Sequence, residues 1–157
     1  RKIGVITGSR QSFHTIERMR GFMKALFDHE IPFNPCWEIN GEWNREDGYA
    51  GAEQLVQQGV TAIFSMNDIM AGGIYDYINE KGMRIGKDLS VIGFDDREIS
   101  EAFYPTLSTV ALPLNHMGSI AAELLTERLE GKKGSGEKKE YKIPCQVINR
   151  NSICKIK

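Results

Sequence analysis

The chain has 157 residues, of which 41% are hydrophobic and 26% charged, and its formal net charge is −1. This length fits one domain with a substantial core, and the balanced charge argues against a strongly basic nucleic-acid-binding surface on this chain. The three cysteines, Cys36, Cys145 and Cys154, form no CxxC or Cys/His pattern. They predict reduced thiols in a cytoplasmic protein and no metal site. No apolar run approaches the roughly 20 residues that span a bilayer.

Strand-like and helix-like patterns alternate along the chain. In order, the sequence predicts a strand over 2–7, a helix over 12–29, an extended segment over 31–39, a helix over 44–59, a strand over 60–66, a helix over 67–82, strands over 89–94 and 106–112, a helix over 114–131, a charged loop over 132–140 and an extended segment over 141–153. The strands are apolar on both faces. This combination predicts an α/β fold with a mostly parallel sheet and helices on both faces.

The first predicted helix and the start of the chain add two expectations. The helix over 12–29 carries one apolar stripe, expected to face the core: Ile16, Met19, Met23, Leu26 and Phe27. The opening "RKIGVITG" is too short in its apolar part for a signal peptide. It also lacks an initiator methionine, so we expect the chain to be a piece of a longer protein.

Polar or aromatic groups follow four successive predicted strands. They are the Gly8–Ser9 loop, the residues just after Ile39, Asn67, and the pair Asp95 and Asp96. Ligands of open α/β sheets bind outside the carboxyl ends of the strands. The sequence therefore predicts a ligand cleft at this rim.

The pair Asp95 and Asp96 has three interpretations. It could bind a metal ion, although such sites usually take another carboxylate from the end of the first strand, where Gly8 and Ser9 stand here. Asp95 could cap a short helix near "REISEAF". It could also accept hydrogen bonds from a bound small molecule.

Three further side chains are candidates at the rim. The guanidinium of Arg18 suits paired oxygen acceptors, and Trp43 could stack on a sugar or a heterocycle, or simply plug the core. His14 could donate to a ligand or be an ordinary surface or cap residue, while Arg10 and Arg20 are expected to be solvated. No GxGxxG after a strand, no GKS or GKT and no nucleophile elbow occurs, which argues against nucleotide loops and Ser/His/Asp catalysis.

The strings "NDIMA", "GKDLSVIGFDD", "PTLSTV" and "MGSIAAELL" resemble the carboxy-terminal half of the LacI/GalR family of bacterial transcription regulators. The resemblance extends back to "RKIGVITG" and covers nearly the whole chain. It implies a periplasmic-binding-protein-like fold, of which this chain is one of two subdomains. Residues 1–112 and 145–157 would form the second subdomain, and residues 113–144 would be a crossover helix and strand belonging to the first.

The resemblance also implies the effector contacts. Arg18 matches the arginine that clamps effector oxygens, Trp43 the aromatic that stacks on the effector, Asn67 a polar contact and Asp95 the hydrogen-bonding carboxylate. His14 falls where relatives often have a small hydroxyl residue. Two departures concern the ends of later strands: Leu112 stands where some sugar-binding relatives have glutamine, and Asp96 is expected to serve the following turn.

The same resemblance implies a homodimer. Its contacts would come from segments 69–78 and 99–105, and the large candidates are Ile69, Tyr77, Phe103 and Tyr104. The alternative is that these side chains belong to the core.

The function implied is effector binding and dimerisation in a LacI/GalR-type regulator. A sugar or sugar-like molecule would control operator DNA binding by a helix-turn-helix headpiece that this chain does not contain. The resemblance implies no enzyme activity, cofactor or membrane association. The alternative is a periplasmic sugar-binding receptor of an ABC transporter.

The helix over 114–131 has two possible packing partners. Its apolar stripe consists of Met117, Ile120, Ala121, Leu124 and Leu125. A plain α/β fold packs this stripe onto the chain's own sheet, whereas the resemblance implies packing on the other subdomain. Without that subdomain, we expect the helix to fold back, dock on another molecule or exchange between protomers.

Overall fold

The computed structural model describes residues 2–131 and 140–155. Its main sheet contains four parallel strands in the order β2-β1-β3-β4. Their bounds are β1 Ile3–Thr7, β2 Glu38–Asn40, β3 Ala62–Ser65 and β4 Ser90–Ile92. Parallel bridges from Ile92 to Ser108 and from Asp95 to Ala111 join β4 to β5 (Thr109–Ala111), and β6 (Gln146–Ile148) pairs antiparallel with β5. The predicted α/β fold with a mostly parallel sheet is confirmed.

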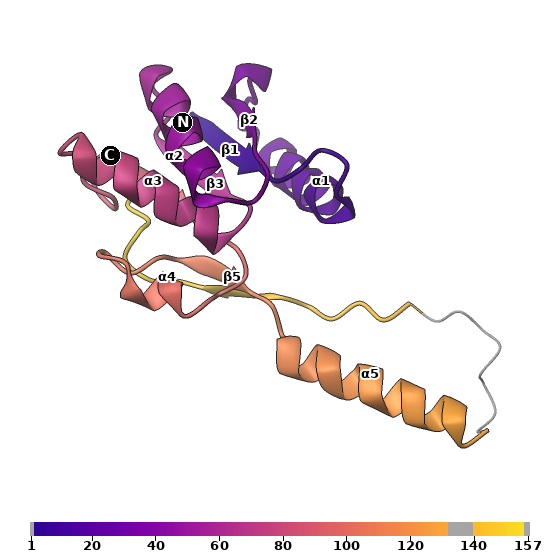
Figure 1. The fold of residues 1–157 in the computed structure, drawn as a ribbon. Helices are drawn as coiled ribbons and strands as arrows, with labels where there is room; N and C mark the ends of the chain where they lie inside the picture. Colours follow the sequence, from indigo (N-terminus) through magenta and orange to yellow (C-terminus); the bar gives the residue numbers. More distant parts are fainter. Residues whose placement is uncertain (1, 132–139, 156–157) are drawn as a thin grey trace.

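The helices cover the two faces of the sheet unequally. They are α1 Phe13–Asp28, α2 Arg45–Gln57, α3 Asp68–Glu80, α4 Ile99–Ala102 and α5 Leu114–Leu129, with a 3₁₀ turn over Pro35–Trp37. In Figure 1, α2 and α3 lie on one side of the sheet and α1 on the other. Buried apolar side chains come mainly from the strands and from α2 and α3, including Leu55, Met70 and Ile74, whereas α1 contributes Leu26.

The pairing of α2 with α3 depends on two glycines. A Cβ at Gly48 would lie 1.9 Å from the carbonyl oxygen of Met70, and a Cβ at Gly73 would lie 1.9 Å from the carbonyl oxygen of Arg45. Any larger side chain would push the two helices apart. The glycines in α3 therefore permit close packing, which offsets their low helix propensity.

The predicted core stripe of α1 was wrong in part. Leu26 is buried and Met19 is partly buried, but Ile16, Met23 and Phe27 are 47%, 38% and 84% exposed. The inward face instead carries Thr15, Met19, Phe22 and Leu26. This spacing is also helical, so periodicity alone did not decide which of two overlapping stripes meets the sheet.

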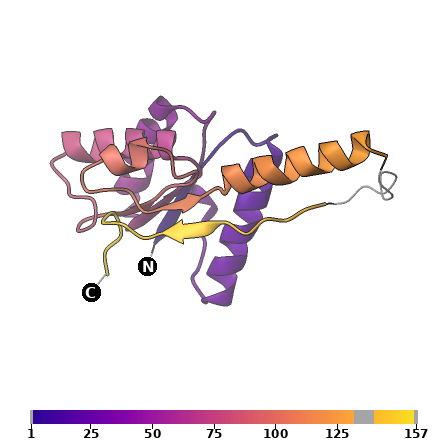
Figure 2. The ribbon, with the colours of Figure 1, turned by 90° about the horizontal axis from the view of Figure 1, so that it is seen from below.

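Helix α5 projects away from the rest of the chain (Figure 2). None of its residues is buried, and Leu125 and Leu129 are 61% and 79% exposed. Its apolar stripe therefore does not pack onto the chain's own sheet. Most of the predicted charged loop over 132–140 lies outside the described residues. In the described part of the chain, no helix is long and apolar enough to cross a membrane.

Candidate functional site

The carboxyl ends of β1, β2 and β3 meet at one rim of the sheet. The register places Thr7 beside Asn40 and Ile6 beside Ser65. Asn40 Oδ1 accepts hydrogen bonds from Thr7 Oγ1 at 3.2 Å and from Arg10 Nε at 2.7 Å. Arg10 is exposed, as expected, and it also donates to this polar rim.

Arg18 connects α1 to the end of the β4 strand. Its Nη2 donates to Asp95 Oδ1 at 3.2 Å, and its Nη1 donates to the carbonyl oxygen of Met66. The side chains of Arg18 and Asp95 are only 14% and 25% exposed. The pair therefore places one cation and one anion, both partly desolvated, at the rim.

Two aromatic rings lie close to the guanidinium of Arg18. The guanidinium carbon of Arg18 lies 3.8 Å from the ring centroid of Phe94 and 5.5 Å from that of Trp43. The indole in turn packs on Gly8, where an added Cβ would lie 1.9 Å from the Trp43 ring. The site thus combines apolar ring faces with a fixed donor and a fixed acceptor, as small-molecule sites do.

Backbone strain concentrates at the same rim. Among the described residues, four non-glycine residues have positive φ: Glu30, Trp43, Asp95 and Asp96. The last three have φ of 71°, 107° and 54° and lie at strand ends of the rim. Such conformations cost about 1–3 kcal/mol each and cluster at functional sites.

Burial shifts the protonation equilibria of the central pair. It raises the pKa of the Asp95 carboxyl, and the neighbouring Arg18 opposes that rise. Burial likewise lowers the pKa of the Arg18 guanidinium, which Asp95 counteracts. Both groups gain from a partner that restores hydrogen bonds lost from water.

Asn67 and His14 lie at the same end of the sheet in different settings. Asn67 caps α3: its Oδ1 accepts from the backbone N–H of Met70 at 2.7 Å, and its Nδ2 donates to the carbonyl oxygen of Trp43 at 3.0 Å. It therefore holds the Trp43 loop, and both side-chain polar atoms already have partners. His14 is exposed, and its ring meets that of Phe13 edge to face with centroids 6.3 Å apart.

The structure distinguishes among the three interpretations of the pair Asp95 and Asp96. Asp96 Oδ1 lies 2.9 Å from Arg150 Nη1 and accepts from Ser100 Oγ at 3.3 Å, so Asp96 supports the turn that follows. Asp95 does not cap α4, because the cap position is Glu98. Within the described residues, no group of three or more His, Cys, Asp or Glu side chains is placed to hold a metal ion.

Two residues at the site were missed in the sequence. One is Phe94, which the sequence indicated only as the last residue of a predicted buried strand. The other is Asp68, a buried carboxylate that accepts from Thr109 Oγ1 at 2.7 Å and from the backbone N–H of Arg97 at 2.8 Å. Burial raises the pKa of Asp68, and these two hydrogen bonds oppose the rise. Asp68 thereby fixes the loop that carries Asp95. In the sequence, the position of Asp68 directly after the helix cap Asn67 was the only feature that could have indicated this role.

The four residues expected at a dimer contact differ in accessibility. Tyr104 is 92% exposed, whereas Tyr77 is 4% exposed and meets Tyr49 edge to face. Phe103 and Ile69 are partly buried, and Phe103 stacks on Tyr75 at a centroid distance of 4.6 Å. Tyr104, Phe103 and Ile69 remain reachable by a second molecule, while Tyr77 packs within its own chain.

The chain is similar to several known proteins. The family model for the periplasmic binding protein-like domain matches residues 1–153. The ribose operon repressor of Haemophilus influenzae is 36% identical over 132 residues, which cover 83% of this chain and 40% of that protein. The transcriptional repressor PurR of Aliivibrio salmonicida is 33% identical over 157 residues, covering 99% and 46%.

A solved structure adds the same likeness in three dimensions. A LacI family transcriptional regulator from Enterococcus faecium, determined with bound ribose, superimposes with a TM-score of 0.88 at 27% identity. The match covers 99% of this chain and 57% of that one. The chain thus spans about half the length of the curated relatives that it matches.

Proposed function

The chain belongs to the periplasmic binding protein-like domain family, in its LacI/GalR branch of transcription regulators, and we propose that it is the effector-binding and dimerising half of such a regulator. The observation that carries the proposal is the Arg18–Asp95 pair, whose guanidinium lies close to the rings of Phe94 and Trp43. This set presents a donor, an acceptor and apolar faces to one ligand.

The effector that fits this set best is a small sugar. Neighbouring hydroxyl groups can donate to a carboxylate and accept from a guanidinium at the same time, and the C–H face of a sugar stacks on an aromatic ring. Asp95 Oδ1 already accepts from Arg18, and Oδ2 has no hydrogen-bond partner in the described structure, so it can accept from a sugar hydroxyl. Two relatives support this choice by name, one a ribose operon repressor and one solved with bound ribose.

Control of DNA binding would follow by linkage. An effector that contacts one arrangement of two subdomains better than another shifts their equilibrium, and a DNA-binding headpiece responds to that shift. Operator DNA is therefore a partner of the longer protein and would be bound outside this chain. This role places the protein in the cytoplasm and requires no enzyme activity. A periplasmic receptor is not favoured, because the matching relatives are repressors.

The dimer contact would be centred on Tyr104. The loop that carries it is held by the stacking of Phe103 on Tyr75 and by a hydrogen bond of 2.7 Å from Tyr75 Oη to the carbonyl oxygen of Pro105. A large aromatic side chain that is exposed on a fixed loop is typical of the centre of a protein–protein interface.

Helix α5 would belong with the other subdomain. Its exposed stripe, with Leu125 at 61%, has no counterpart on this chain's sheet. Replacing Leu125 by Glu should therefore change the free energy of unfolding of this chain by less than about 0.5 kcal/mol in a urea titration. A loss of several kcal/mol would show that α5 packs on this subdomain.

The proposed function is tested by a ligand screen on the full-length polypeptide. Thermal unfolding is followed with D-ribose, other aldoses, sugar phosphates and nucleobases. A saturable rise in melting temperature with a sugar supports the proposal. Stabilisation by nucleobases alone would overturn the sugar assignment, and no response to any compound would argue against effector binding.

A further inference from the structure

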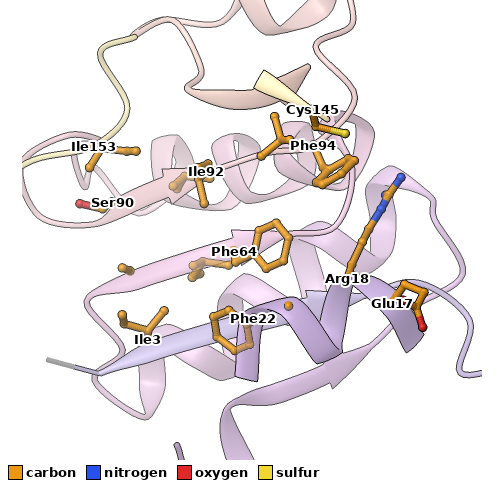
Figure 3. A pocket seen from close by; sticks show the side chains of 15 residues that line it. Ile3, Glu17, Arg18, Phe22, Phe64, Ser90, Ile92, Phe94, Cys145 and Ile153 are labelled. Carbon is orange, nitrogen blue, oxygen red and sulfur yellow. The ribbon is translucent and has the colours of Figure 1, made fainter. Parts of the chain in front are cut away.

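A row of exposed apolar side chains runs along the outer flank of α1. Its four members are each at least 38% exposed: Phe13, Ile16, Met23 and Phe27. Arg18 and Phe22 leave α1 on another side and line an apolar pocket over the sheet, and the lining of that pocket includes none of the four (Figure 3). The row is therefore separate from the Arg18–Asp95 site, and contiguous exposed apolar patches mark interaction surfaces.

The spacing of the row matches the seam of a coiled coil. Positions 13, 16, 20, 23 and 27 are separated alternately by three and four residues, which is the repeat with which two helices pack side by side. Arg20 stands at the middle position. Its side chain is 71% exposed, and its aliphatic stem can cover apolar surface while the guanidinium reaches water. The packing of α1 on its own sheet does not explain this seam, because other residues of α1 meet the sheet.

The charged residues beside the seam favour an identical helix as the partner. Glu17 and Lys24 each directly follow a seam residue, so they stand at equivalent places one heptad apart. When two such helices pack antiparallel, residues at these places face each other, which sets Glu17 of each copy beside Lys24 of the other. A parallel pair would instead set the two Arg20 side chains against each other. Both charges already pair with Arg20 or Asp28 within α1, but exposed pairs of this kind contribute little and can rearrange.

A hollow at the C-terminal end of α1 fits the same arrangement. Its volume is about 520 Å³, and its lining consists of Leu26, Phe27, Asp28, Glu30, Ile31 and Pro32. In the antiparallel register that the charges select, Ile16 faces Phe27 of the second copy, so Phe13, almost one turn earlier, faces the hollow. Glu30 has φ of 53° and is, among the described residues, the one non-glycine residue with positive φ that lies away from the rim. Strained residues of this kind cluster at functional sites.

We propose that this seam is a self-docking surface, on which α1 of a second copy packs antiparallel. The seam consists of Phe13, Ile16, Arg20, Met23 and Phe27. Each copy inserts Phe13 into the hollow of the other, and two pairs of opposite charge fix the register. A single pair of helices buries less area than a standard interface of about 1,600 Å². The contact therefore joins two dimers at high protein concentration rather than building the dimer itself, and it does not depend on the proposed effector function.

Disulfide trapping in the full-length protein tests this register. All native cysteines are replaced by serine, and one variant then carries Ile16→Cys and another Phe27→Cys. A mixture of the two should form a mixed disulfide roughly tenfold faster, or more, than either variant links to itself, because only facing positions come within disulfide reach. Gln54→Cys, exposed on α2, is the control and should not link to Ile16→Cys.

Three results of this experiment would overturn the proposal. One is an equal rate of linkage in all mixtures. Another is faster linkage of Ile16→Cys to itself, which would indicate parallel helices. The third is an Ile16→Cys thiol that a soluble reagent cannot reach, because the rest of the full-length polypeptide would then cover the seam.

A charge reversal separates this docking from non-specific association. Glu17→Lys sets like charges beside Lys24 of the second copy, so it should weaken the association of dimers roughly fivefold in sedimentation at high protein concentration. Adding Lys24→Glu to the same chain restores opposite charges and should recover the parental association. Phe27→Glu should abolish the association and leave the dimer intact. A single variant that associates like the parent protein, or a double variant that stays as weak as the single one, would refute the antiparallel docking.

Discussion

Arg18 and Asp95, which are 77 positions apart in the sequence, share a hydrogen bond of 3.2 Å at the carboxyl ends of the parallel strands. α1 supplies the guanidinium, and the loop after β4 supplies the carboxylate. Neither group keeps full contact with water, and burial disfavours the charged form of each. A ligand that hydrogen-bonds to both compensates for this lost hydration, which is the physical basis of the proposed effector site.

The proposed contact between Trp43 and the effector can be tested without substituting a residue that contacts the ligand. In Gly8→Ala, the new Cβ would lie 1.9 Å from the indole ring, so the ring must move away. Effector affinity should then fall about tenfold, or ~1.4 kcal/mol, in calorimetry. Gly118→Ala is the control, because its Cβ meets nothing within 4 Å. Unchanged affinity in Gly8→Ala would mean that Trp43 does not contact the effector.

Effector affinity should depend on the ionisation of Asp95. The ionised carboxylate accepts ligand hydrogen bonds and the neutral acid does so poorly, so affinity should fall as the pH drops through the pKa of Asp95. Because burial raises that pKa, the fall should begin at a higher pH than for an ordinary aspartate of pKa about 3.9. Calorimetry across pH, with circular dichroism to verify folding, measures it. A pH profile that is the same in Asp95→Asn would assign the titration to another group.

Arg150 should matter for stability rather than for the effector. Its guanidinium lies 2.9 Å from Asp96 Oδ1 and donates to the carbonyl oxygen of Leu107 at 2.9 Å. Arg150→Met should cost about 2–3 kcal/mol in urea unfolding, less than the ~3–5 kcal/mol of a fully buried pair, because Asp96 keeps 27% exposure. Arg84→Met, at an exposed pair with Asp88, should cost much less, because water screens that pair. Similar losses in the two variants would contradict this assignment.

The proposed dimer contact predicts a selective effect at Tyr104. Tyr104→Glu in the full-length protein should weaken dimerisation more than about tenfold in sedimentation analysis, because a buried, unpaired charge would replace an aromatic contact. Phe27→Glu provides the matched control, since Phe27 is 84% exposed on α1. If both variants dimerise like the parent protein, the contact lies elsewhere.

The sequence was sufficient to predict the order of strands and helices, and the reasons are local. Apolar β-branched runs marked β1 and β3, and Asn67 with Gly82 marked the ends of α3, where Asn67 does cap the helix. The rim followed from topology, since the carboxyl ends of parallel strands must meet. These inferences need no knowledge of how side chains pack.

Packing explains what the sequence did not reveal. Two overlapping apolar stripes on α1 have the same period, and only the sheet selects the one with Phe22 over the one with Phe27. Asp68 looked like an ordinary acidic residue in a first helical turn, yet it lies buried against Thr109, 41 positions away. Long-range pairs of this kind leave no periodic signal.

The most direct test of the effector site is calorimetric titration of the full-length protein and its Asp95→Asn variant with D-ribose, or with the sugar that the screen selects. The account predicts that the variant loses roughly 1.5–3 kcal/mol of binding free energy, more than tenfold in affinity, while circular dichroism shows that it remains folded. Asp88→Asn, in an exposed pair away from the rim, should bind like the parent protein. An Asp95→Asn variant that binds the sugar with unchanged affinity would contradict the site described here.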